Sequence, residues 1–99
     1  MKLSEYVEYD ATGLAALIRD GEVPAAEVHD AARAALEAVD ETLNAVVSGP
    51  WEAPLKYDPA GSFAGIPFAL KDFAIHAAGV PTCFGSRLAG EGVVFPHDT

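Results

Sequence analysis

A lysine at the end of a short apolar run is the residue of this sequence best placed to do chemistry. The run reads GIPFALKD from Gly65 to Asp72, with Lys71 directly after Leu70. Its length and its Gly and Pro at the head favour a buried strand over about 66–71. Burial lowers the pKa of a lysine, so a neutral amine becomes available as a base or a nucleophile. The ordinary alternative is a lysine whose methylenes lie on apolar surface while its ammonium reaches water.

The carboxylate next to the lysine has a different predicted role. If the strand continues through Asp72, its side chain points to the face opposite that of Lys71. The two charges then need not pair. We expect Asp72 to cap the turn that follows.

Three other side chains are weaker candidates for a nucleophile. Cys83 follows His76 by seven residues, but no acidic or amide group is placed to orient the histidine. A small buried side chain is the ordinary interpretation of such a cysteine. Ser62 and Ser86 could be activated by a neutral amine, yet each follows a glycine, which favours a turn.

The sequence predicts no metal or cofactor site. His29, His76 and His97 do not have the spacing of a zinc site, and a single cysteine could join them. The segment around Cys83 lacks the Gly-Lys pair of a phosphate-binding loop.

Composition narrows the class of partner and the compartment. The chain has 99 residues, 51% of them hydrophobic, and a formal net charge of -9, which argues against nucleic acid as a partner. The first residues carry no signal-peptide pattern, and no apolar stretch is long enough to span a bilayer. With one cysteine as well, we predict a cytoplasmic protein with no membrane partner.

The charges are spread unevenly along the chain. Of the 21 charged residues, 16 lie within residues 1–58, so the remaining part resembles a segment that is buried by other elements. The last residues, 95–99, show neither a helix stop nor a polar tail. We therefore expect this sequence to be a piece of a larger protein.

The first predicted helix covers about 11–20. Asp10 or Thr12 can cap its start, and Gly21 supplies the left-handed residue that ends it. One face of this helix is apolar and consists of Leu14, Leu17 and Ile18.

The second predicted helix covers about 25–40. Pro24 suits its first turn, and Glu27 places negative charge where the helix dipole favours it. Core packing, rather than a groove for a partner helix, is the predicted role of its apolar stripe, which consists of Val28, Ala32, Ala35, Leu36 and Val39.

The elements after the helices are shorter. Residues 43–47 fit a strand or a helix end that leads into one, and we favour the strand. Residues 48–62 predict a surface connection because proline and glycine recur in them. The lysine strand over about 66–71 comes next.

In this order, the elements resemble the amino-terminal part of the amidase signature family of serine hydrolases. The resemblance covers nearly the whole chain, and its most specific part is the Gly-Ile-Pro-x-x-x-Lys-Asp block. It also rests on the two helices, on Asn44 to Val47, on Gly79 to Thr82, on Gly85 and Ser86, and on Asp98.

The resemblance implies an incomplete α/β fold, with the amino-terminal helices and first strands of a mixed-sheet domain. It implies hydrolysis of a carbon–nitrogen bond in a small-molecule amide by a serine, a bridging serine in a cis peptide, and a lysine. Lys71 matches that lysine, the general base. Neither Ser62 nor Ser86 matches a family serine, so this fragment alone is expected to be inactive and to need the remainder of the amidase chain.

Two alternatives remain open at this point. One is a subunit of a glutamyl-tRNA(Gln) amidotransferase, which shares the family's motifs and would need partner subunits. The other is a truncated, non-catalytic interaction module that docks through its apolar second half. The substrate and the oligomeric state are not predicted.

Overall fold

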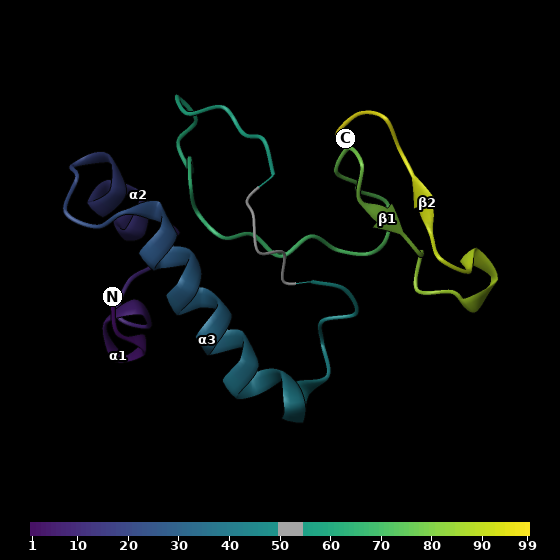
Figure 1. Ribbon diagram of the computed structural model, residues 1–99, viewed down its shortest axis with the longest axis horizontal. Coiled ribbons are helices and arrows are strands. Elements are labelled where there is room, and N and C mark those ends of the chain that lie inside the picture. Colours follow the sequence, from purple (N-terminus) through teal and green to yellow (C-terminus); the bar gives the residue numbers. More distant parts are fainter. Residues whose placement is uncertain (50–54) are drawn as a thin grey trace. The chain divides into compact units, whose positions relative to one another are not determined.

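The computed structural model describes residues 1–49 and 55–99 and divides into two compact units, Met1–Pro67 and Phe68–Thr99. The described elements are compatible with part of an α/β fold, the predicted class. None of the helices in these residues combines the length and apolarity needed to cross a membrane. Figure 1 shows the elements in chain order: α1 (Leu3–Tyr6), α2 (Ala11–Arg19), α3 (Ala25–Leu43), β1 (Pro81–Thr82), the 3₁₀ helix η1 (Arg87–Ala89) and β2 (Val93–Val94).

Helix α2 has the boundaries that its sequence predicts. It begins after Asp10, whose carboxylate accepts a hydrogen bond from the backbone N–H of Gly13 at 2.8 Å. Asp10, rather than Thr12, is therefore the cap. At the other end Gly21 has a left-handed φ of 73°, as predicted for a helix stop.

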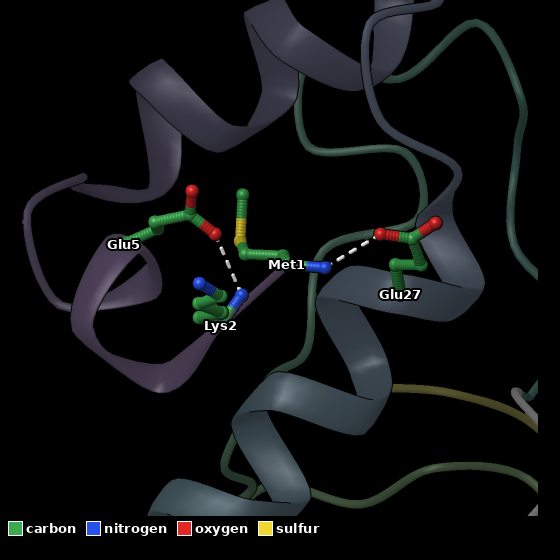
Figure 2. Close-up of polar contacts among 4 residues, drawn as sticks. All are labelled: Met1, Lys2, Glu5 and Glu27. Carbon is green, nitrogen blue, oxygen red and sulfur yellow. Dashed lines mark hydrogen bonds and ion pairs between the residues drawn. The ribbon is translucent and has the colours of Figure 1, made fainter.

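Helix α3 begins one residue after Pro24, which occupies the N-cap position in extended conformation. Proline offers no side-chain cap, but Glu27 lies in the first turn and pairs with the amino group of Met1. The backbone N–H of Lys2 also donates to the Glu5 carboxylate at 2.7 Å. As Figure 2 shows, the Met1–Glu27 pair ties the start of the chain to α3, whereas the Lys2–Glu5 bond caps α1.

The end of α3 differs from the prediction. The helix continues to Leu43, and Asn44 takes a left-handed conformation with φ 48°. The side chain of Asp40 then accepts hydrogen bonds from the backbone N–H groups of Ala45 and Val46, at 2.8 and 3.0 Å. The strand predicted at this point is not formed. Leu43 belongs to α3, and the N–H groups of Ala45 and Val46 donate to this carboxylate rather than to a neighbouring strand.

The core of the first unit lies between its helices. Val28 is fully buried, which confirms the predicted apolar face of α3 at its amino-terminal half. Val39, predicted on the same face, is 46% exposed, so the stripe is not covered along its whole length. The buried apolar residues of this unit are Leu14, Ala15, Val28 and Ala31.

The head of the lysine segment is a tight turn that requires glycine. Gly65 has a φ of 77°, and a Cβ atom there would lie 2.9 Å from the Cβ of Ala25. Tyr57 and Ile18 are the next neighbours, at 3.5 and 3.8 Å. Gly65 therefore packs the chain directly against the start of α3.

The second unit contains a small antiparallel sheet. β1 pairs with β2, with Pro81 opposite Val94 and Thr82 opposite Val93. Thr82 is buried, although threonine is polar. Gly92 has a φ of 93°, and a Cβ there would lie 2.9 Å from the Cβ of Pro81, so the return to β2 depends on a glycine.

Replacing Gly65 by alanine separates backbone strain from crowding. We expect Gly65→Ala to lower the free energy of unfolding by about 2–4 kcal/mol, because it adds overpacking to an unfavourable φ. Gly21→Ala is the matched control, since Gly21 has a similar φ of 73° with nothing within 4 Å. It should cost only about 1–2 kcal/mol. Urea unfolding followed by circular dichroism measures both, and equal losses would contradict the close packing at Gly65.

Candidate active site

The lysine segment does not form the strand predicted over 66–71. In the described residues β1 and β2 pair with each other, and residues 66–71 have no neighbouring strand to complete a ladder. Phe68 is 83% exposed and Leu70 is 36% exposed. The side chain of Lys71 is exposed with them, so the predicted burial of the lysine is absent from this structure.

Lys71 and Asp72 are adjacent but are not joined by an ion pair. Within residues 1–49 and 55–99, the ion pair that forms connects Met1 with Glu27.

The carboxylate of Asp72 binds a distant turn. Its Oδ1 accepts a hydrogen bond from the backbone N–H of Cys83 at 2.7 Å, and its Oδ2 accepts one from Gly85 at 3.2 Å. The prediction that Asp72 caps the turn directly after it is therefore wrong in position. The side chain does cap a turn, but one that lies more than ten residues further along the chain.

The turn that Asp72 binds has an unusual backbone. The N–H of Ser86 donates to the carbonyl of Cys83 at 3.0 Å, which closes a four-residue turn. Its two central residues, Phe84 and Gly85, have φ angles of 56° and 63°. Two successive positive φ angles define a type I′ turn, which a bulky side chain such as phenylalanine rarely enters. Backbone N–H groups that converge in a turn can bind an anion, and here the N–H groups of Cys83 and Gly85 donate to the Asp72 carboxylate.

Aromatic contacts also hold the same turn. The ring of Phe84 lies edge-to-face with Phe73 and with Phe95, each at a centroid distance of 6.5 Å. Phe73 directly follows Asp72, so the residues after Lys71 meet the turn through one polar and one aromatic side chain. Edge-to-face pairs of this kind are each worth about 0.5–1.5 kcal/mol beyond the area they bury.

The end of the described chain runs alongside the segment after Phe73. The side chain of Asp98 accepts a hydrogen bond from the backbone N–H of Ala78 at 2.8 Å. The N–H of Gly79 donates to the carbonyl of Phe95 at 3.0 Å, and the ring of His76 stacks on Phe95 at 4.0 Å. These contacts join residues 76–79 to residues 95–98 within the second unit.

Of the weaker nucleophile candidates, Cys83 and Ser86 have structural roles. Cys83 contributes its backbone N–H to Asp72, and its free thiol is half-buried. The hydroxyl of Ser86 accepts a hydrogen bond from Leu88 at 3.2 Å and caps η1, which confirms the predicted turn role. Ser62 is exposed in the turn before Gly65.

The histidines lie in separate surroundings. His29 is half-buried on α3, and the rings of His76 and His97 meet edge-to-face at 5.5 Å in the second unit. Across the part of the chain that the structure describes, no group of three or more His, Cys, Asp or Glu side chains could hold a metal ion.

The contact between Asp72 and residues 83–85 was missed by sequence reasoning. No local pattern signals a hydrogen bond across eleven residues, and the positive φ of Phe84 has no sequence marker. The glycine at position 85 is the single hint that a turn with positive φ lies there.

Comparison with known proteins finds homologues over most of the chain. It is 34% identical, over 97% of its length, to a glutamyl-tRNA(Gln) amidotransferase subunit from Streptomyces coelicolor. It is 36% identical, over 71% of its length, to 6-aminohexanoate-cyclic-dimer hydrolase from Pseudomonas sp.. The matches span 21% and 15% of these two relatives. No family model and no solved structure matches the chain.

Removing the Asp72 carboxylate should open the turn that it binds. In Asp72→Ala, we expect the backbone amides of Cys83 and Gly85 to exchange hydrogen at least about tenfold faster, because hydrogen bonds to a charged acceptor contribute about 1.5–3 kcal/mol. Residue-resolved amide exchange by NMR measures this. Glu91→Ala is the control, since Glu91 is an exposed acidic residue of the same unit. Unchanged exchange at both amides in Asp72→Ala would show that the carboxylate does not hold the turn.

Proposed function

Because this chain is homologous to proteins of the amidase signature family, we propose that it is part of an amidase that hydrolyses a carbon–nitrogen bond, with Lys71 as its general base. The observation that carries the proposal is the homology along 97% of the chain to an amidotransferase subunit, together with homology to a hydrolase. The Gly-Ile-Pro-x-x-x-Lys-Asp block, Gly65 to Asp72, lies within this resemblance.

The proposed mechanism uses the neutral amine of Lys71 as a proton acceptor. The amine takes a proton from a bridging serine, which takes one from a nucleophilic serine, whose oxygen attacks the amide carbonyl. The proton returns to the leaving nitrogen as the carbon–nitrogen bond breaks and an acyl-enzyme forms. Water then attacks the acyl-enzyme by the same route and releases the acid. Both serines belong to segments outside these 99 residues.

We also propose that the chain is the amino-terminal portion of a single larger amidase domain with a mixed sheet. The chain spans about a fifth of the amidotransferase relative, which supports this. In that domain the further strands give residues 66–71 the sheet neighbours that they lack, and the rest of the protein buries Phe68 and Leu70. The same burial removes Lys71 from water, which a lysine base requires. A cytoplasmic location accompanies this proposal.

Substitution of Lys71 in the full-length protein tests the assignment. Lys71→Ala is expected to lower kcat by at least about 10³-fold, because the serines lose their proton acceptor. Lys71→Arg should be about as inactive, since a guanidinium keeps its charge and cannot accept a proton. Ammonia release from a panel of primary amides first shows which amide the unchanged enzyme hydrolyses fastest. Turnover of the variants is then measured with that amide.

Lys56→Ala is the matched control, because Lys56 is an exposed lysine outside the Gly65 to Asp72 block. It should retain turnover close to that of the unchanged enzyme. If Lys71→Arg were active while Lys71→Ala is inactive, the position would need a positive charge rather than a base. Full activity in Lys71→Ala would overturn the proposed role and favour a non-catalytic interaction module.

The second candidate function is that of an amidotransferase component. The specific observation in its favour is that the match to the glutamyl-tRNA(Gln) amidotransferase relative covers 97% of the chain, against 71% for the cyclic-dimer hydrolase. The two functions differ in their need for partners. A free-standing amidase hydrolyses simple amides as a purified single protein, whereas an amidotransferase component co-purifies with its partner subunits from its host and needs them for amide transfer.

A further inference from the structure

We propose that Asp72 is a positioning residue for Lys71, because its carboxylate locks the turn at residues 83–86 and thereby fixes the direction in which the lysine leaves the chain. This inference rests on the proposed function, since it assigns a task to the neighbour of the proposed base. Lys71, Asp72 and the turn all belong to the second unit, Phe68–Thr99.

The first step is geometric. Asp72 is bonded to Lys71 through one peptide, so its backbone sets where the lysine side chain starts. Both carboxylate oxygens accept backbone N–H groups, from Cys83 at 2.7 Å and from Gly85 at 3.2 Å. Two bonds from one planar carboxylate fix its orientation as well as its distance. The peptide between Lys71 and Asp72 is therefore held against a single turn.

The second step is energetic. Phe84 lies between the two donors and has a φ of 56°, which costs a residue with a Cβ about 1–2 kcal/mol. Such strain persists only where the surroundings over-determine it, and it is concentrated at functional sites. Here the surroundings are the Asp72 carboxylate and the rings of Phe73 and Phe95. The carboxylate stabilises the positive-φ turn, and the turn in return holds the carboxylate.

The third step is electrostatic. A carboxylate within ion-pair distance of a lysine stabilises the ammonium form and opposes its use as a base. Both oxygens of Asp72 are instead directed to backbone N–H groups, and the described residues show no ion pair between Asp72 and Lys71. Asp72 therefore positions its neighbour without holding a proton on it.

Asp98 provides a matched control for the catalytic test. Its carboxylate also accepts a backbone N–H within the second unit, from Ala78 at 2.8 Å. It differs from Asp72 in being distant from Lys71 in sequence. A loss that follows from weakening the second unit affects both variants, whereas a loss of lysine positioning affects Asp72 alone.

The experiment compares Asp72→Asn and Asp98→Ala in the full-length enzyme, since alanine at position 98 removes the one bond to Ala78. Asparagine keeps the size of the side chain but turns an NH₂ group toward one backbone N–H, so one of the two bonds is lost. We expect kcat of Asp72→Asn to fall about 10–100-fold with KM within about threefold, as for a displaced catalytic group. Asp98→Ala should keep kcat within about threefold. Urea unfolding of both variants shows whether they are comparably stable and folded.

Asp72→Glu serves as the conservative variant, because it restores the carboxylate with one additional methylene. Partial recovery of kcat relative to Asp72→Asn supports positioning by the carboxylate. Equal losses of kcat in Asp72→Asn and Asp98→Ala would overturn the inference and assign Asp72 to stability alone. Loss of turnover in Lys71→Ala with full kcat in Asp72→Asn would also overturn it, while leaving the proposed function intact. Full turnover in Lys71→Ala would instead overturn the proposed function.

Discussion

The second unit depends on the two backbone hydrogen bonds that the Asp72 carboxylate accepts. Each is charge-assisted, and such bonds contribute about 1.5–3 kcal/mol. They act on a turn whose central Phe84 costs about 1–2 kcal/mol for its positive φ. The carboxylate therefore offsets the strain with a margin. Without the carboxylate, the turn between residues 83 and 86 would relax, and the ring of Phe84 would no longer be held against Phe73 and Phe95.

The first unit is the part that local rules predict best. The cap at Asp10, the stop at Gly21 and the amphipathic face through Val28 each depend on residues within one or two helical turns. The predicted strands at 43–47 and 66–71 failed for a shared reason. A strand exists only with a neighbour that satisfies its backbone, and the described residues supply none to either segment.

In the candidate site, too, the contacts between distant residues are the part that the sequence does not predict. Lys71 is proposed as a base from the order of elements along the chain, because its local sequence fits a surface lysine as well as a base. The partner of Asp72 was not predicted, since the contact joins residues separated by eleven positions and uses the backbone, not the side chain, of Cys83. Every residue except proline carries a backbone N–H, so residue type does not indicate which N–H will bind a carboxylate. The glycine at 85 marked a turn without indicating what binds it.

A lysine base has two physical requirements, and this chain meets them unequally. In our proposal the direction is set by the backbone N–H groups of Cys83 and Gly85, which donate to the Asp72 carboxylate. A neutral amine additionally needs low polarity around it, and Phe68, 83% exposed, shows that this apolar segment is uncovered. In the proposed enzyme, two parts of the protein therefore meet these two requirements. The second unit supplies the orientation, and the segments that cover Phe68 and Leu70 supply the exclusion of water, so the base becomes competent only when the two are assembled.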